Sequence, residues 1–334
     1  MRRLLALALF AAVFANPAAF AQKKDKKDKT PVTNGKMIIW QDPGDIRSKN
    51  LLIGPGEGDK AQLPVKFDTE DMEAHSPKFD VKDANGEKWK VKLGPEAQPE
   101  PVASRLMWAM GYFANDNYFL HDLAVDGLPK LKRGNNFESK VNGEQHVKDV
   151  RLQRHQLGKK DGDWKWKKNP FLKTREFNGL RVMMALLRNW DLKDENNAIY
   201  IDKDGTQLYT VTDVGSTFGM TGRSYTDAMS KNDLTKYRRA KFITKVRPDY
   251  VDFNFPTHAP LLFVFAPNFF LHVLTNHWVG KHIPREDAKW IGGMLGQLSH
   301  EQICDAFRAG GYNPQEVEEF AKVLEARIAE LNKL

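Results

Sequence analysis

The feature that most constrains the fold of this chain is a succession of local patterns between residues 177 and 215. Apolar residues recur at helical spacing from Phe177 to Leu187, and the polar stretch Asn-Trp-Asp-Leu-Lys-Asp-Glu-Asn at residues 189–196 follows. Residues 198–201 and 208–211 are apolar and predict two strands, joined by a turn that contains glycine. The second strand runs directly into Asp-Val-Gly at residues 213–215. The order of helix, polar loop and hairpin therefore places one polar group at each end of a single hairpin.

The side chains of this segment are those that phosphoryl transfer requires. That reaction needs a carboxylate to orient the acceptor hydroxyl, a cation near the γ-phosphate and oxygen ligands for Mg²⁺. Asp191, Lys193, Asn196 and Asp213 supply this set. In the alternative reading, Asp191 caps a turn and Asp213 ends a strand by bonding to local backbone. We favour the functional reading because it accounts for all four residues at once.

Residues 191–196 resemble the catalytic loop of protein kinases, and residues 213–215 resemble their magnesium-binding Asp-Phe-Gly. The order of the two motifs and the hairpin between them also agree. The resemblance implies an α+β, bilobal fold and ATP with Mg²⁺ or Mn²⁺ as cofactors. It further implies that Asp191 is the catalytic base or orients the acceptor, that Lys193 faces the phosphate, and that Asn196 and Asp213 bind the metal. It covers residues 78–219 and is specific only in residues 191–215.

A kinase-like site also needs a strand lysine for the α- and β-phosphates. Residues 78–83 and 87–93 alternate polar and apolar side chains around an Asn-Gly pair, which predicts a β-hairpin. On its second strand Lys88, Lys90 and Lys92 share one face, so the pattern leaves all three open. We favour Lys92, the last of them before a glycine, for nucleotide binding, with Lys90 as the alternative.

The glutamate that holds such a lysine is expected on the next helix. Helical spacing from Val102 to Met110, with Pro101 in the first turn, predicts that helix. Glu100 is the first candidate for the partner and Glu96 the second. The interval between lysine and glutamate is shorter than in typical protein kinases, and a carboxylate at a helix start is favourable for the helix dipole in any case.

Two departures from the protein-kinase pattern indicate a divergent branch. No Gly-x-Gly-x-x-Gly precedes the lysine strand, and residues 73–77 take the place of the phosphate loop. Trp190 stands where many kinases have an arginine before the catalytic aspartate, so activation-loop phosphorylation read by that arginine is not expected. The chain is in these respects similar to bacterial toxin-type, spore-coat and secretory-pathway atypical kinases, or to phosphoinositide kinases.

The N-terminus predicts export to the periplasm or the medium. Residues 1–21 have the charged, apolar and small-residue order of a signal peptide, with cleavage expected after Ala21. Its removal takes away two arginines, so the formal net charge falls from +8 to +6 (8 − 2). Residues 22–36 are lysine-rich and predict a disordered linker. A single cysteine, Cys304, excludes an intramolecular disulfide.

The remaining chain divides into two predicted lobes. Residues 37–156 read as a β-rich N-terminal lobe and residues 157–334 as a mostly helical C-terminal lobe, with the site between them. Residues 261–279 are apolar, but proline, asparagine and histidine interrupt them. Because polar groups are costly in a bilayer, we expect two packed helices there and no transmembrane segment once the signal is removed.

The expected partners are a nucleotide and a protein or small-molecule acceptor, and no nucleic acid. The first alternative is a catalytically inert kinase-like binding module of the cell envelope, because ATP is scarce outside the cytoplasm. The second is an envelope protein that binds an anionic polymer through the aromatic and basic residues 164–168. We expect instead that Trp164 and Trp166 pack against the second lobe.

Overall fold

The computed structural model describes residues 35–56, 60–73, 76–154, 158–219, 230–255 and 276–334. The predicted signal peptide, most of the predicted linker and most of the apolar stretch 261–279 lie outside these residues. Within the described part, no helix is both long and apolar enough to cross a membrane. All described residues fall in one compact unit.

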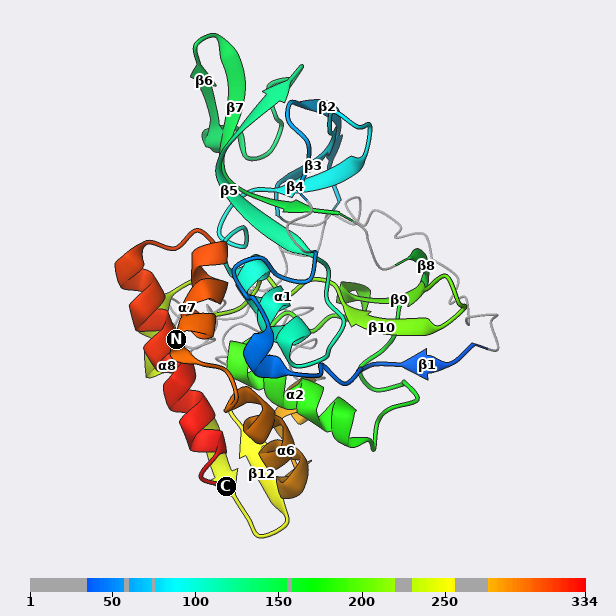
Figure 1. Cartoon of the computed structure of the whole chain (residues 1–334), viewed down its shortest axis with the longest axis vertical. Helices are drawn as coiled ribbons and strands as arrows, with labels where there is room; N and C mark the ends of the chain where they lie inside the picture. Colours follow the sequence, from blue (N-terminus) through cyan, green and yellow to red (C-terminus); the bar gives the residue numbers. More distant parts are fainter. Residues whose placement is uncertain (1–34, 57–59, 74–75, 155–157, 220–229, 256–275) are drawn as a thin grey trace, which may run out of the picture. The chain divides into compact units, whose positions relative to one another are not determined.

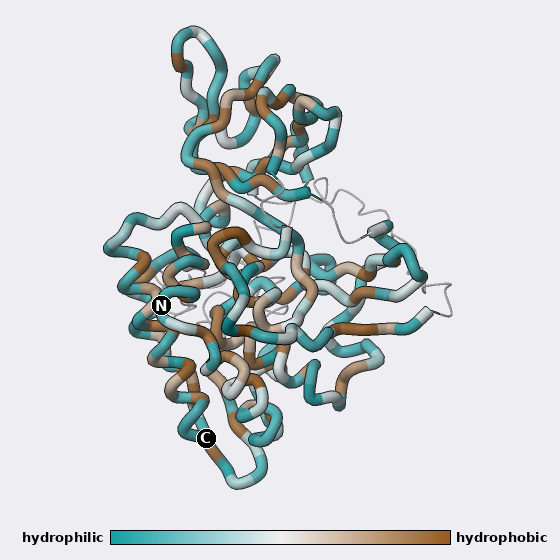
Figure 2. The backbone as a smooth tube through the Cα atoms, viewed as in Figure 1, coloured by the Kyte–Doolittle hydropathy of each residue, from teal (hydrophilic) through white to brown (hydrophobic). Residues whose placement is uncertain are grey.

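A six-stranded sheet forms the N-terminal part of this unit (Figure 1). Its strands, in spatial order, are β4 (Lys88–Lys92), β3 (Lys78–Lys82), β2 (Val65–Asp71), β5 (Asn117–Asp126), β7 (Glu144–Gln153) and β6 (Glu138–Val141). β4 also pairs with the end of β7, which closes five of the strands into a ring. Brown and teal stretches alternate along these strands in Figure 2, as expected where one face of each strand is buried.

The predicted hairpin between β3 and β4 is confirmed. The two strands are antiparallel, with Lys82 opposite Lys88 and Phe79 opposite Val91. Gly86 in the turn has a φ of +80°, a conformation that glycine adopts without steric cost. Phe79 and Val91 are fully buried in the core of the six-stranded sheet. Alternation along β4 therefore turns its apolar side chains inward.

The predicted helix after this hairpin is confirmed as α1 (Pro99–Ala109). Proline suits its first turn because the missing N–H has no partner there in any helix. α1 packs against β5 on one side and against a C-terminal helix, α7 (His300–Ala309), on another. It is buried along nearly its whole length, and its apolar residues belong to the core of the helical part.

The C-terminal part is mostly helical, as predicted. It contains α2 (Arg175–Leu187), α3 (Leu234–Arg239), α6 (Arg285–Leu295), α7 and α8 (Pro314–Leu331), with the short strands β11 (Ile243–Val246), β12 (Tyr250–Phe253) and β13 (Ile283–Pro284). Short 3-10 turns occur at residues 46–48, 135–137, 194–196 and 277–280. α7 and α8 begin with complete capping boxes, formed by Ser299 with Gln302 and by Asn313 with Glu316. Each box pairs residues three positions apart, so a short sequence pattern marks where the helix starts.

A second sheet of four strands carries the motif segment. Its order is β1 (Met37–Ile38), β10 (Gln207–Val211), β9 (Asn197–Ile201) and β8 (Lys159–Gly162). β1 was grouped by sequence with the β-rich lobe that starts at residue 37, but it pairs in parallel with β10. The following residues Ile46 and Leu51 lie in the same hydrophobic core as α2 and α7. The first residues of the described chain thus contribute to the helical part.

Candidate active site

The loop after α2 is held in place by its own backbone and by neighbouring segments. α2 ends at Leu187, and the left-handed conformation of the next residue, Arg188, turns the chain. The Asn189 side chain accepts a hydrogen bond from the Asp191 N–H at 3.2 Å. The Asn196 Nδ2 donates to the Asp191 carbonyl at 2.8 Å, which closes the loop on itself. Trp190 N–H donates to the Ser216 carbonyl at 3.4 Å and ties the loop to the residues beyond the hairpin.

The hairpin brings the two ends of the motif together. β9 and β10 are antiparallel, with Asn197 opposite Val211. One residue further out, the Thr212 N–H donates to the Asn196 carbonyl at 2.9 Å. Asn196 therefore faces the residue that immediately precedes Asp213. Carboxylate and carboxamide oxygens are the donor types that Mg²⁺ and Mn²⁺ prefer, so the chemistry of this pair fits either ion.

Lys92 connects the six-stranded sheet to this hairpin. Its Nζ lies 3.0 Å from a carboxylate oxygen of Glu96, 3.0 Å from Glu100 and 3.2 Å from Asp213. Lys92 is at the end of β4 and Glu100 is in the first turn of α1, whereas Asp213 follows β10, 121 residues later in the chain. Of the two glutamates that the sequence offered as partners for Lys92, the structure brings both to it.

Two further cations complete the cluster around Lys92. The Arg151 Nε on β7 lies 3.1 Å from Glu100, and both side chains are almost fully buried. The Lys231 ammonium pairs with Glu96. Glu96 also accepts hydrogen bonds from the hydroxyls of Ser76 at 2.9 Å and Ser216 at 3.0 Å.

The pKa shifts of the cluster follow from burial and from these partners. Burial alone lowers the pKa of the Lys92 ammonium, but the carboxylates of Asp213, Glu100 and Glu96 outweigh it and raise that pKa above its ordinary value. Burial also raises the pKa of Glu96, but Lys92 and Lys231 outweigh it, so that pKa is lowered. For Glu100, burial is stronger than the opposing effect of Arg151 and Lys92, and its pKa is raised.

Asp191 and Lys193 form a separate pair at the loop. The Lys193 Nζ lies 2.7 Å from one carboxylate oxygen of Asp191 and 3.0 Å from the other. The Asp191 side chain is mostly buried, whereas that of Lys193 is partly exposed. A lysine in this position neutralises the carboxylate and also presents a cation toward solvent.

Lys90, the alternative to Lys92, lies in another group of charges. Its Nζ is 2.9 Å from Asp71 and 3.2 Å from Asp80, which are on the neighbouring strands β2 and β3. Lys88 pairs with Asp68 at 3.1 Å. Both lysines thus pair with carboxylates of the sheet, and the structure does not bring either to Asp213.

Gly215 allows the segment after β10 to approach Glu96 and the first turn of α1 closely. A Cβ atom at this position would lie 2.8 Å from the Cβ of Glu96 and 3.3 Å from a carboxylate oxygen of Glu100. Such a distance is too short for two carbon atoms, so any larger residue would push this segment away from the lysine cluster. The close contact with Glu96 therefore explains why the third residue of the Asp-Val-Gly motif is a glycine.

Sequence reasoning missed Arg151 and Lys231. Arg151 is 2% exposed although it carries a charge, and it lies in β7 between the fully buried Val150 and Leu152. An arginine flanked directly by two apolar residues, Val150 and Leu152, was the available signal. Lys231 has no local signal, because its partner Glu96 lies 135 residues away. Of the residues predicted in place of a phosphate loop, 74–75 lie outside the described part.

Trp164 and Trp166 pack inside the helical part, as predicted. They are 2% and 1% exposed, and their ring centroids lie 4.9 Å apart. The Trp164 Nε1 donates to the Thr210 carbonyl at 2.9 Å. Rings buried in this way cannot stack on an external polymer, so the basic and aromatic stretch is a structural element.

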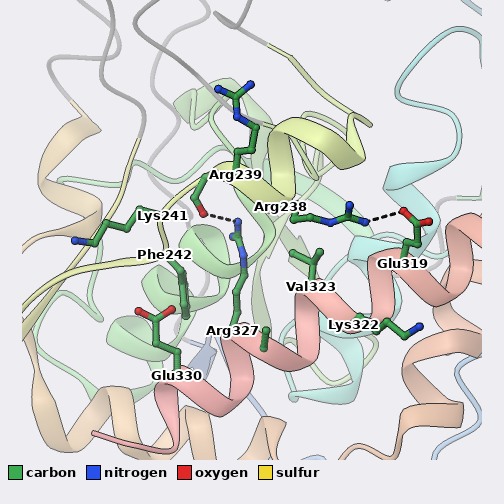
Figure 3. Close-up of a pocket in the computed structure, with 11 residues that line it drawn as sticks. Arg238, Arg239, Lys241, Phe242, Glu319, Lys322, Val323, Arg327 and Glu330 are labelled. Atoms are coloured by element: carbon green, nitrogen blue, oxygen red, sulfur yellow. Dashed lines mark hydrogen bonds and ion pairs between the residues drawn. The ribbon is translucent and has the colours of Figure 1, made fainter.

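A hollow of about 530 Å³ lies between α3 and α8 (Figure 3). Arg238 on one wall pairs with Glu319 on the other at 2.7 Å. Arg327 donates to the carbonyls of Tyr237 at 2.7 Å and Ala240 at 3.1 Å. These contacts brace α3 against α8. None of the motif residues lines this hollow, so the candidate active site remains the region around Lys92, Asp191 and Asp213.

No protein-family model and no curated protein sequence matches the chain. Solved structures do match. The crystal structure of a Helicobacter pylori proinflammatory kinase, CtkA, aligns with a TM-score of 0.45 at 12% identity, over 80% of this chain and 96% of that chain. The crystal structure of the Golgi casein kinase aligns with a TM-score of 0.31 at 10% identity, over 86% of this chain and 78% of that chain.

The fold is α+β, bilobal and protein-kinase-like. This assignment rests on the arrangement described above: a β-rich part with a strand lysine, a helix that carries its glutamate partner Glu100, and a helical part in which a polar loop and a hairpin end at Asp213.

Proposed function

We propose that this chain is an exported phosphotransferase that uses ATP with Mg²⁺ or Mn²⁺ and acts on a hydroxyl group of a protein or a small molecule. One observation carries the proposal. The Lys92 Nζ is within 3.2 Å of both the helix glutamate Glu100 and the motif aspartate Asp213. These three residues come from three separate parts of the fold: the end of β4, the first turn of α1 and the segment after β10. A structural salt bridge needs only one partner, whereas a nucleotide site needs this lysine beside both groups.

The proposed roles follow from the contacts of each residue. Lys92 would bind the α- and β-phosphates, and Glu100 with Arg151 would fix its position. Asp191 would orient the acceptor hydroxyl and take its proton as the new oxygen–phosphorus bond forms and the bond to the leaving phosphate breaks. Lys193 would face the transferred phosphoryl group and offset its negative charge. A divalent ion, when bound, supplies positive charge to the phosphate oxygens, and Asn196 and Asp213 are the residues that would hold it.

Transfer can be tested without knowledge of the acceptor. The mature chain is incubated with radiolabelled ATP and Mg²⁺ or Mn²⁺, and label on the protein and released phosphate are both measured. Asp191→Asn should reduce both by at least about 10²-fold, the usual contribution of a general base. The matched control is Asp202→Asn, because Asp202 is an exposed aspartate in the turn between β9 and β10. Equal loss in the two variants would contradict the role of Asp191.

Nucleotide binding separates this proposal from the inert binding module. Thermal stabilisation by ATP in Mg²⁺, abolished by Asp213→Asn, is expected for the phosphotransferase. Binding without any label transfer or phosphate release would favour the inert module. Absence of stabilisation by any nucleotide would remove the phosphotransferase and leave the inert module.

Export is tested by the N-terminus of the mature protein. The full chain, expressed in a Gram-negative host, should be recovered from the periplasm or the medium with Gln22 as its first residue. Recovery of uncleaved protein in the cytoplasm would contradict this part of the proposal.

A further inference from the structure

Three metal-ligating side chains of different chemical types meet on the pair of helices α7 and α8. His300 and Cys304 are four residues apart on α7 and so lie on the same face of that helix. Glu318 comes from α8. The ligand atoms of these three residues all lie within 4.8 Å of one another. None of them belongs to the site proposed above.

The distances between these atoms match the edges of a metal tetrahedron. The His300 Nε2 lies 3.4 Å from the Cys304 Sγ and 3.5 Å from a carboxylate oxygen of Glu318, and the Sγ lies 3.8 Å from the other oxygen. Zinc bonds of about 2.0–2.3 Å at tetrahedral angles put nitrogen, sulfur and oxygen ligands about 3.4–3.6 Å apart. Small side-chain movements would therefore be enough to bring the three ligand atoms to tetrahedral positions around one ion.

A second, independent contact orients the histidine for such a role. The His300 Nδ1 lies 2.9 Å from a carboxylate oxygen of Glu325, which is about two helical turns beyond Glu318 on α8. A carboxylate on one ring nitrogen favours the tautomer that leaves the other nitrogen as an electron-pair donor. That other nitrogen, Nε2, is the one that faces Cys304 and Glu318. Carboxylate–histidine pairs of this kind accompany many zinc sites.

The exposure of the cluster allows an ion to enter. Cys304 is fully buried, whereas the side chains of His300 and Glu318 are 44% and 46% exposed. Without a cation, burial and the nearby Glu318 raise the pKa of the Cys304 thiol to about 11. A bound divalent ion would offset both effects, because it stabilises the thiolate.

We propose that His300 Nε2, Cys304 Sγ and the Glu318 carboxylate form a site for Zn²⁺ or a chemically similar divalent transition metal, with water as the fourth ligand. Binding forms a sulfur–metal bond, releases the thiol proton to solvent and changes no oxidation state. A nitrogen, sulfur and oxygen ligand set favours zinc or cobalt over magnesium and calcium. The ion would link α7 to α8. The site does not depend on the proposed phosphotransferase activity.

Cobalt(II) provides a direct test because its spectrum reports the ligands. Mature protein without a polyhistidine tag is stripped with a chelator and titrated with Co²⁺. A thiolate-to-cobalt charge-transfer band in the near ultraviolet, with strong visible bands of tetrahedral Co²⁺, is expected, and added Zn²⁺ should remove both. Cys304 is the only cysteine in the chain, so the charge-transfer band can arise from this site alone. Metal bound at Asp213 cannot produce it.

Variants show whether the three ligands act together. Cys304→Ser, which keeps the shape of the side chain, should abolish the charge-transfer band. His300→Ala and Glu318→Gln should each weaken Co²⁺ binding at least about tenfold, the lower end of the range for loss of a metal-site group. The matched control is Glu319→Gln, because Glu319 is the adjacent glutamate on α8 and pairs with Arg238. It should leave binding unchanged.

Two results would overturn the proposal. The first is no charge-transfer band with folded wild-type protein at saturating Co²⁺. The second is a charge-transfer band that appears at the same midpoint Co²⁺ concentration in His300→Ala and Glu318→Gln as in wild type. The thiol would then bind metal without the other two side chains. Either result leaves the nucleotide-binding experiments untouched, and failure of those experiments leaves the cobalt test untouched.

Discussion

Lys92 makes the most direct test of the charge cluster, through its replacement by methionine. Methionine keeps most of the length and apolar volume of the side chain and removes the ammonium. The Lys92 side chain is 6% exposed, and its Nζ contacts three carboxylates at 3.0–3.2 Å. In the variant, Glu100 keeps Arg151 and Glu96 keeps Lys231. Two buried carboxylates thus lose one of their two cations each.

The cost of this loss can be placed in a range. Removal of one member of a buried ion pair destabilises proteins by about 3–5 kcal/mol, because the remaining charge stays desolvated. With a urea m-value of about 3 kcal/mol/M, this change lowers the unfolding midpoint by about 1–1.7 M. The control Lys90→Met removes a lysine from the same strand that is 24% exposed and pairs with Asp71 and Asp80. These pairs are only partly buried, so the loss should lie closer to the value of about 0.2–1 kcal/mol for surface ion pairs.

The difference between wild type and Lys92→Met should shrink in acid. In wild type the pKa of Glu96 is lowered, so the stability that this carboxylate contributes is present above its unfolded pKa and is lost as the pH falls. The pKa of Glu100 is raised, so its unfavourable burial grows as the pH rises through that pKa. Without Lys92 both carboxylates bind protons more readily when folded. The variant therefore regains stability relative to wild type at low pH.

Urea unfolding followed by tryptophan fluorescence at about pH 7 and about pH 5 measures both effects. The expected result is a large loss for Lys92→Met at the higher pH, a smaller one at the lower pH, and a small loss for Lys90→Met at both. Equal losses for the two variants, or a loss for Lys92→Met that does not depend on pH, would refute the reasoning.

Three further predictions follow from single contacts. Gly215→Ala should weaken Mg²⁺–nucleotide binding at least about tenfold, because the added Cβ would lie 2.8 Å from the Cβ of Glu96. The control Gly293→Ala should leave binding unchanged, because a Cβ there has no atom within 4 Å. Calorimetric titration measures the affinity of both variants. Asn313→Ala should lower the free energy of unfolding by about 1 kcal/mol, because its side chain caps α8 at the Glu316 N–H, as urea unfolding would show. Nucleotide affinity should fall sharply when a chelator replaces Mg²⁺, and equal affinity in both conditions would contradict the proposed metal site.

The parts of the site that could be predicted are those written in consecutive residues. Helix α2, the polar loop and the β9–β10 hairpin each have a local pattern, and their order alone puts Asn196 near Asp213. The capping boxes that begin α7 and α8 are equally local, because each is formed by residues three positions apart. Short-range patterns fix these elements, since the forces that form them act between residues a few positions apart.

The parts that could not be predicted depend on pairing over long distances. β1 has two residues, so its alternation carries no information about its partner, and only the folded chain shows that it joins β10. Lys88, Lys90 and Lys92 are equivalent by alternation along β4. Which of these lysines reaches Glu100 and Asp213 depends on where α1 and β10 lie relative to the end of β4. No periodicity within one strand records that position.

The cluster around Lys92 shows why local patterns give only half of this site. Its contacts join three cations, Lys92, Arg151 and Lys231, to three carboxylates, Glu96, Glu100 and Asp213. Opposite charges in equal number make burial tolerable, because each carboxylate has a cation within hydrogen-bonding distance. A polyphosphate brought beside Lys92 would add negative charge to a balanced group, and a divalent ion near Asp213 would compensate for it. Metal and nucleotide are therefore expected to bind together, and this coupling belongs to the balance of the whole cluster rather than to any single motif.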